Sequence, residues 1–299
     1  MRYINRITSI IRTAVITVSF FIVPTAIIQA DFPAYEAPLD IAAWTLNGSA
    51  IECSLTQDIP HYGMAAFTSS ASRKSNMNFD LSLRRHNPSR VTEATLSSEP
   101  PLWKHNKPSK PMGQVTMFPG ASPVNMINND AWNILTELEQ GMFPTFAYSS
   151  WLGNDDQISV ALSAVNFQPV YDEFLACVAG LLPYSFDDIA ETFVYFEYDR
   201  SDFTKQTRES LAKIGAWLEV DKTMELVLLA GHTDSKGKTR YNRKLGMRRA
   251  LAVKTFFVEA GIAGNKIKVQ SFADLQPQSS NATPEGRAKN RRVMLKMVP

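Results

Sequence analysis

The sequence predicts an α+β protein in which a β-rich N-terminal part is followed by a mixed sheet carrying helices on one face. Residues 31–186 contain stretches in which apolar and polar residues alternate, as in half-buried strands. Residues 187–299 alternate strand-like and helix-like segments with short connections, and we expect the order strand, helix, strand, helix, strand, strand. A length of 299 residues with 44% hydrophobic content is enough for two cores.

The charge and cysteine content exclude several classes of protein. The 31 basic and 29 acidic residues give a net charge of +2, which excludes a histone-like protein and an acidic-tail protein. The two cysteines exclude a disulfide-dense scaffold and a four-cysteine zinc or iron–sulfur site made by this chain alone. Any basic site must therefore be local.

Residues 1–30 have the pattern of a cleaved signal peptide. Arg2, Arg6 and Arg12 precede an uncharged, apolar stretch over residues 13–28, and we expect cleavage after Ala30. The alternative is an uncleaved membrane anchor, because Ile28 is larger than the residue that signal peptidase prefers at that position. Both interpretations place the rest of the chain outside the cytoplasm.

The first part of the N-terminal region is expected to be mostly strands. A strand-like stretch covers residues 51–55, and Met77, Phe79, Leu81 and Leu83 alternate with polar residues. Residues 99–122 contain five prolines and little periodicity, which predicts a surface loop. This loop is a candidate docking strip through Leu102 and Trp103, although the tryptophan could equally fill a core.

Two helices are expected in the second part of the N-terminal region. Residues 130–140 form an apolar stripe that Asn129 or Asp130 would cap and Gly141 would end. A strand over residues 158–162 follows, and then a helix over about residues 169–182.

Cys53 and Cys177 lie in the expected strand 51–55 and the expected helix 169–182, respectively. Export permits a disulfide, and this pair is the single one that the chain can form. Two buried free thiols are the alternative.

The C-terminal region begins after residues 183–185. A strand is expected over residues 193–198, and a helix begins after Thr204 and ends near Val220. A strand over residues 225–230 and a helix over residues 242–260 follow, the helix ending at Gly261. Residues 267–272 and 292–298 complete the expected sheet.

The loop after the strand 225–230 carries Asp234, and the next helix carries Arg249. A carboxylate beside a guanidinium is complementary to a zwitterion, such as the free amino-acid end of a peptide. An internal salt bridge between Asp234 and Arg249 is the alternative interpretation. His232 and Asp234 could offer two metal ligands, but no third ligand follows at a suitable spacing, so we expect no metal and no cofactor.

Residues 235–258 contain eight basic residues and no acidic one, and residues 285–293 add four more positive charges. This pattern predicts a locally concentrated positive field, for which a solvated helix face and nucleic-acid binding are the alternative interpretations. Export argues against nucleic acid, so we expect no nucleic-acid partner.

Four ordered blocks between residues 231 and 293 resemble the peptidoglycan-associating OmpA C-terminal-like domain. They are Gly231-His232-Thr233-Asp234, Asn242-x-x-Leu245, Arg249-Ala250 and Thr283-x-Glu285-Gly286-Arg287-Ala288-x-Asn290-Arg291-Arg292-Val293. The resemblance implies that Asp234 and Arg249 hold the diaminopimelate of the stem peptide. Thr233, Asn242, Leu245, Asn290 and Arg291 would complete the pocket.

Gly246 departs from this pattern, because a serine usually follows the leucine in that family. The glycine removes a hydroxyl and weakens the start of the expected helix by up to ~1 kcal/mol, so it could reduce affinity.

The whole chain resembles the MotY family of exported components of sodium-driven polar flagellar motors. The resemblance rests on Trp44, Ile51-Glu52-Cys53, Asn78-Phe79-Asp80-Leu81, the stretches 131–139 and 143–146, and Tyr184-Ser185-Phe186-x-Asp188-Ile189-Ala190. It implies a protein of the periplasmic T ring that docks on the flagellar basal body with MotX and recruits a PomA–PomB-type stator. Both cysteines fall where that family has its disulfide.

These observations predict a non-enzymatic anchor. Residues 31–186 would dock on the basal body and residues 187–299 would bind peptidoglycan, in the periplasm and in association with the outer membrane and cell wall. A general peptidoglycan tether without a motor role is the first alternative. A cell-wall hydrolase is the second, and His61, His86 and His105 are not set at a catalytic spacing from any nucleophile.

Overall fold

The computed structural model describes residues 33–84, 88–151, 156–224 and 226–298. The predicted signal peptide over residues 1–30 lies outside this part of the chain, as do His86 and Glu225. Within the described ranges, no helix combines the length and the apolar character needed to cross a membrane.

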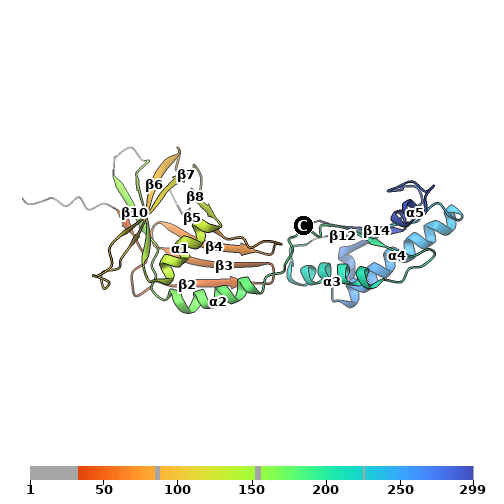
Figure 1. Cartoon of the computed structure of the whole chain (residues 1–299), viewed down its shortest axis with the longest axis horizontal. Coiled ribbons are helices and arrows are strands. Elements are labelled where there is room, and N and C mark those ends of the chain that lie inside the picture. Colours follow the sequence, from red (N-terminus) through yellow and green to blue (C-terminus); the bar gives the residue numbers. More distant parts are fainter. Residues whose placement is uncertain (1–32, 85–87, 152–155, 225, 299) are drawn as a thin grey trace, which may run out of the picture. The chain divides into compact units, whose positions relative to one another are not determined.

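The N-terminal region contains two five-stranded sheets (Figure 1). One sheet has the order β1 (Ala34–Tyr35), β10 (Gln157–Ala161), β9 (Phe143–Ser149), β6 (Thr92–Glu99) and β7 (Lys110–Met117). The other is antiparallel throughout and has the order β2 (Trp44–Gly48), β3 (Glu52–Ile59), β4 (Gly63–Ser70), β5 (Asn78–Leu83) and β8 (Val124–Ile127). The expected predominance of strands is confirmed.

Both sheets contribute to one aromatic core. Phe67 and Phe79 from the second sheet and Phe146 from the first are fully buried. The rings of Phe79 and Phe146 stack with centroids 5.7 Å apart, so the two sheets meet through this pair. The alternation predicted for residues 77–83 places Phe79 and Leu81 in this core.

The helices of this region begin earlier than predicted. Helix α1 (Asn129–Glu139) has Asn128 as its N-cap residue, with no side-chain cap hydrogen bond, so the expected capping by Asn129 or Asp130 was wrong. Gly141, with φ 69°, ends it as expected. Helix α2 (Phe167–Ala179) starts two residues before the predicted segment, because Phe167 continues its buried stripe against Trp44.

The expectation of a structureless loop over residues 99–122 was wrong, because strand β7 lies inside it. Pro111 is compatible with this strand because β7 is at the edge of its sheet, where a missing N–H disrupts little pairing. The pairing of β6 with β7 also contains a register shift between Leu96 and Ser97, and Gly113 on β7 has a positive φ. This irregularity next to Pro111 helps the strand to accommodate the proline. The segment between β6 and β7 has no strand or helix, and in it Leu102 is 88% exposed and Trp103 is 52% exposed. The ring of Trp103 packs against the ring of Phe143.

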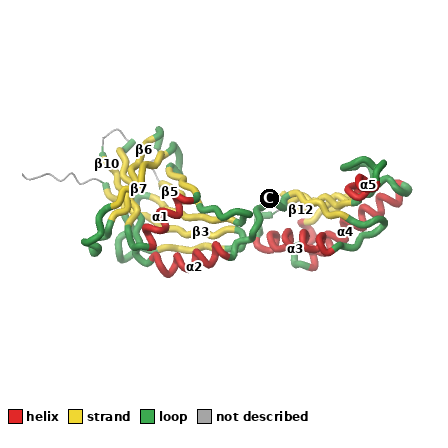
Figure 2. Tube along the Cα trace, viewed as in Figure 1, coloured by secondary structure: helices red, strands yellow, loops and turns green. Residues whose placement is uncertain are grey.

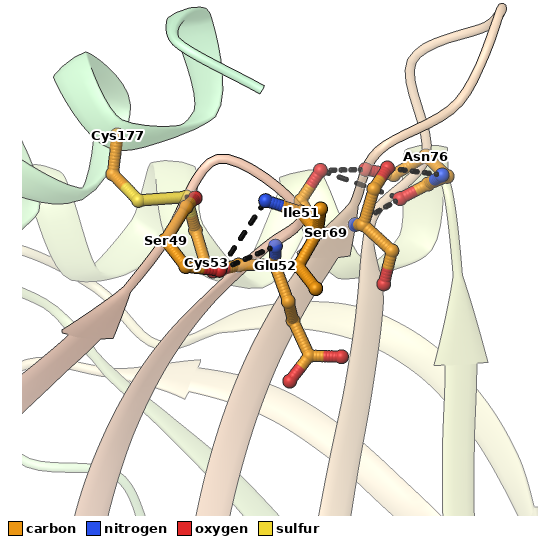
Figure 3. Close-up of a disulfide and its surroundings, with 8 residues drawn as sticks. Ser49, Ile51, Glu52, Cys53, Ser69, Asn76 and Cys177 are labelled. Atoms are coloured by element: carbon orange, nitrogen blue, oxygen red, sulfur yellow. Dashed lines mark hydrogen bonds between the residues drawn. A yellow bond between two sulfur atoms is a disulfide. The ribbon is translucent and has the colours of Figure 1, made fainter. Parts of the chain in front are cut away.

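A disulfide joins Cys53 on β3 to Cys177 on α2, so the interpretation as two free thiols was wrong (Figure 3). The bridge links residues 124 positions apart, and in the chain-entropy description a loop of this length is worth about 4–5 kcal/mol. Gly48 permits the helix to approach, because a Cβ there would lie 2.6 Å from the sulfur of Cys177. Beside it, Ser49 accepts hydrogen bonds from the N–H groups of Ile51 and Glu52.

The C-terminal region is a mixed four-stranded sheet, as predicted. Its order is β11 (Glu191–Tyr195), β14 (Arg292–Val298), β12 (Leu226–His232) and β13 (Ile267–Ala273). Strands β12 and β13 are parallel, and β14 is antiparallel to both of its neighbours.

Helices α3 (Lys205–Val220) and α4 (Thr239–Glu259) pack on one face of this sheet (Figure 2). Leu211, Ile214, Val253 and Phe257 from the helices share a core with alternate strand residues such as Leu229. Thr204 caps α3 as expected, because its hydroxyl accepts the N–H of Thr207. A third helix, α5 (Pro284–Asn290), was not predicted, although Thr283 and Pro284 form a regular helix start.

Candidate functional site

The candidate site begins where strand β12 ends. Thr233 and Asp234 follow His232 directly, and the N–H of Thr233 donates to the carbonyl of Ala273 at 2.9 Å. This bond fastens the loop to the neighbouring strand β13. Asp234 is therefore held at the rim of a rigid sheet, as the sequence predicted.

Asp234 is 3% exposed and has partners on both carboxylate oxygens. Oδ1 accepts the backbone N–H of Lys236 at 3.0 Å, and Oδ2 accepts Nη1 of Arg291 at 3.1 Å. The alternative interpretation, an internal salt bridge between Asp234 and Arg249, was wrong, because the ion-pair partner of Asp234 among the described residues is Arg291.

Arg249 has no measurable exposure, and its guanidinium binds the backbone. Nε donates to the carbonyl of Arg200 at 2.9 Å, Nη1 to that of His232 at 3.1 Å and Nη2 to that of Glu197 at 2.9 Å. These bonds use three of the five N–H groups of a guanidinium. Burial lowers the pKa of Arg249 to about 10, so it stays protonated at neutral pH.

A small cavity of about 70 Å³ lies between these groups. It is lined by Thr233, Asp234, Arg249 and Arg291, among others. Thr233 is 2% exposed, and within the described part of the chain its hydroxyl has no hydrogen-bond partner. A buried hydroxyl without a partner is costly unless a ligand or water satisfies it. The cavity therefore offers a carboxylate, two guanidinium groups and an unpaired hydroxyl.

Helix α4 supplies two further predicted residues to this cavity. Asn242 is buried and donates Nδ2 to the carbonyl of Asp234 at 3.3 Å and to Oδ1 of Asp274 at 3.4 Å. Leu245, one turn later, is 5% exposed and lines the cavity wall. Asn242 therefore fixes the loop, and Leu245 contributes an apolar part of the cavity wall.

Asn290 is the one predicted residue that does not line the cavity. Its Oδ1 accepts the N–H groups of Gln278 and Ser279, and its Nδ2 donates to Ser279 and Asn281. Asn281 in turn accepts the N–H of Ser235, next to Asp234. Asn290 therefore acts on the site through the loop that it holds.

Five lining residues were not among the predicted binding residues, namely Tyr198, Asp199, Lys236, Gly237 and Tyr241. The hydroxyl of Tyr241 donates to the carboxylate of Asp199, which connects helix α4 to the segment after β11. Tyr198 and Tyr241 remain exposed at the rim. The signal for Tyr241 was its position one residue before Asn242; no local pattern pointed to Tyr198 or Asp199.

Gly246 lies inside helix α4, which starts at Thr239 rather than at Asn242. A Cβ on Gly246 would lie 2.4 Å from the hydroxyl oxygen of Ser271, which donates to the carbonyl of Arg243. Gly231 approaches from the other side, since a Cβ on it would lie 2.0 Å from the carbonyl of Gly246. The glycine pair lets α4 contact β12 closely and does not weaken a helix start.

His232 is buried under the ring of Phe272, and both of its ring nitrogens lack partners among the described residues. Burial and the charge of Arg292 lower its pKa to about 4, so His232 is neutral at neutral pH. No group of three His, Cys, Asp or Glu side chains arranged to hold a metal occurs in the described ranges.

Comparisons with known proteins agree along the chain. Residues 35–183 match the MotY N-terminal domain, and residues 195–291 match the OmpA family. The sodium-type flagellar protein MotY of Vibrio parahaemolyticus is 37% identical over 264 residues, which is 88% of this chain and 89% of that protein.

Shorter matches include two peptidoglycan-associated lipoproteins. The peptidoglycan-associated lipoprotein of Pseudomonas aeruginosa is 35% identical over 107 residues, covering 36% of this chain and 62% of that protein. The solved peptidoglycan-associated lipoprotein of Burkholderia pseudomallei is 26% identical, covering 36% of this chain and 89% of that one with a TM-score of 0.34.

Proposed function

The chain belongs to the MotY family, and from this premise we propose that it is a structural component of the periplasmic T ring of a sodium-driven polar flagellar motor. In this role it binds peptidoglycan and recruits or stabilises stator units for motility. The match to the flagellar relative over 88% of the chain supports the motor role, and the match to the OmpA family supports wall binding.

The two regions divide this work. Residues 31–186 dock on the flagellar basal body together with MotX, and residues 187–299 hold the wall. A PomA–PomB-type stator is then retained against a fixed support. The protein works in the periplasm, at the basal body and next to the outer membrane, and catalysis has no part in this proposal.

The observation that carries wall binding is the composition of the small cavity. Asp234 accepts the ammonium of a zwitterion, while Arg249 and Arg291 hold its carboxylate. The unpaired hydroxyl of Thr233 gains a partner when the ligand enters. A free amino-acid end such as that of diaminopimelate in a stem peptide has this combination of charges.

Sedimentation of the mature protein with purified sacculi tests the site. Asp234→Asn keeps the shape of the side chain but removes the charge that accepts the ammonium, and we expect binding to fall at least tenfold, since a charge-assisted hydrogen bond is worth about 1.5–3 kcal/mol. Asp202→Asn is the matched control, because Asp202 is exposed and does not line the cavity. Equal binding by Asp234→Asn and wild type would reject the site.

Immunodetection of the chain in purified basal bodies tests the motor role. We expect the protein to be present there. Its absence from basal bodies, together with recovery on sacculi, would instead support a general peptidoglycan tether without a motor role.

A further inference from the structure

Six exposed cations surround the start of helix α4, and we call them the basic collar. Its members are Lys236, Lys238, Arg240, Arg243, Lys244 and Arg248. Arg240, Lys244 and Arg248 recur at intervals of four and so form one stripe along the outer face of the helix. Residues 235–258 contain no acidic side chain that could compensate them.

The collar is electrostatically unfavourable for the protein alone. None of its members forms a salt bridge within the described ranges. Like charges four residues apart destabilise a helix. The first residues of α4 also lie at the positive end of the helix dipole, and the N-cap Lys238 makes no side-chain cap hydrogen bond. This concentration of positive charge is best compensated by an anion from outside the chain.

The collar is continuous with the cavity of the candidate site. Lys236 belongs to the collar and lines the cavity. The guanidinium carbon of Arg248 lies 5.8 Å from the ring centroid of Tyr241, which also lines the cavity. The buried hydroxyl of Thr233, which has no partner among the described residues, also indicates that a ligand binds in this cavity. When the end of a ligand occupies the cavity, the rest of that ligand therefore extends past these cations.

We propose that the basic collar binds the free carboxylates of the peptidoglycan stem peptides around the one whose end occupies the cavity. This inference rests on the proposed function, because it extends the wall site outward. The cavity holds one amino-acid end, and the collar supplies a second, less specific attraction to the polyanionic wall.

The two acidic residues that line the cavity favour binding of wall peptides over binding of an anionic lipid surface. Asp234 and Asp199 line the cavity and would repel a phosphate headgroup that entered it. A stem peptide offers an ammonium for Asp234 and further carboxylates for the collar. Binding to lipid vesicles is therefore treated as an alternative outcome.

The test uses a triple variant, Lys238→Gln, Arg240→Gln and Lys244→Gln, in the full mature chain. None of these residues lines the cavity, so the zwitterion site stays intact. The matched control is Lys205→Gln, Lys222→Gln and Lys296→Gln, which removes three exposed cations elsewhere on the C-terminal region. Sedimentation with sacculi is measured across NaCl concentrations from about 50 mM to about 500 mM.

We expect the collar variant to bind sacculi about five- to tenfold more weakly than wild type at the lowest salt concentration, as three exposed ion pairs would imply. The two proteins converge at high salt, where the Debye length falls to a few ångströms. The control variant stays within about twofold of wild type. Thermal stability of the collar variant is equal to or above that of wild type, which separates this loss from unfolding.

Identical salt curves for the collar variant and wild type overturn the inference. It is also overturned if the collar variant loses binding to vesicles containing phosphatidylglycerol while its sacculus binding is unchanged. Asp234→Asn separates this result from failure of the proposed function. If Asp234→Asn loses binding while the collar variant does not, the wall site stands and the collar has no part in it.

Discussion

Arg249 holds the framework of the site and also provides part of its binding chemistry. Its bonds to the carbonyls of Glu197, Arg200 and His232 tie together the segment after β11, the end of β12 and helix α4. The same guanidinium lines the cavity and brings its positive charge to it. Removing this side chain therefore tests stability and binding at the same time.

We predict that Arg249→Ala destabilises the protein by about 3 kcal/mol or more, because the buried carbonyl of His232 and the part-buried carbonyls of Glu197 and Arg200 lose their partner. Arg249→Lys keeps the charge but cannot reach three carbonyls, so a smaller loss is expected. Urea unfolding measures both. Stability of Arg249→Ala within about 0.5 kcal/mol of wild type would contradict this role.

His232 makes stability depend on pH. Burial lowers its pKa from the ordinary value of 6.5 to about 4 in the folded protein. Between these values the unfolded chain binds a proton that the folded protein does not, so the free energy of unfolding falls as the pH falls from 6.5 toward 4. The slope from this group is at most about 1.4 kcal/mol per pH unit.

We predict that His232→Phe reduces this loss while preserving the stacking on Phe272. Urea unfolding of both proteins at pH 7.5 and pH 5 measures this effect. The change in the free energy of unfolding between the two pH values is compared between wild type and variant, so that the contributions of all other titrating groups cancel. Arg292, the charged neighbour on β14, is unchanged in the comparison. An equal pH effect in both proteins would show that His232 is not the responsible group.

At the scale of elements, close packing of helix α4 on the sheet depends on two glycines. The carbonyls of Gly231 and Gly246 occupy the space that side chains on these residues would need. Ser271 from β13 fills the remaining gap with its hydroxyl. A serine at position 246 would therefore compete with Ser271 for one place.

We predict that Gly246→Ser destabilises the protein by about 1–3 kcal/mol through overpacking. Adding Ser271→Ala should recover part of this loss, although Ser271→Ala alone costs about 0.5–1.5 kcal/mol for its hydrogen bond to Arg243. A double-mutant cycle measures the coupling. Strict additivity would contradict direct competition.

Strand β7 shows the limit of local patterns at this scale. Pro111 and Gly113 break the periodicity that identifies a strand. The strand forms nevertheless because β6 offers hydrogen-bond partners along its length. That partner lies almost entirely before residue 99, so the pattern of residues 99–122 alone could not reveal the pairing.

At the scale of the whole molecule, the proposed division of work predicts two opposite phenotypes. Asp234→Asn should remain in basal bodies but fail to sediment with sacculi. Leu102→Ala with Trp103→Ala should sediment normally but be depleted from basal bodies, because these exposed residues are the proposed docking strip.

Both assays on both variants, with motility as a third measurement, check this prediction. Both variants should lose motility. Unchanged melting temperatures are the control for folding, particularly for Trp103, which contacts Phe143. Loss of both activities in either variant would contradict independent docking and wall binding.

Sequence patterns alone predicted the α+β class, the order of the strands and of the two long helices in the C-terminal region, and seven binding residues, of which six line the cavity. Periodicity and the ordered motifs are local, so they can be recognised along the chain. Thr233 and Asp234 stand directly after a buried strand, and Asn242, Leu245 and Arg249 follow the helical spacing.

Which charges pair depends on how the strands and helices pack in space. Asp234 forms an ion pair with Arg291, which directly precedes β14, because antiparallel pairing of β12 with β14 brings these distant residues together. Arg249 instead donates to backbone carbonyls. Packing also places Tyr198 and Asp199 at the cavity. It keeps Asn290 outside the cavity, where this residue bonds to the loop that contains Asn281. Such contacts depend on how strands and helices pack in space, which local spacing does not encode.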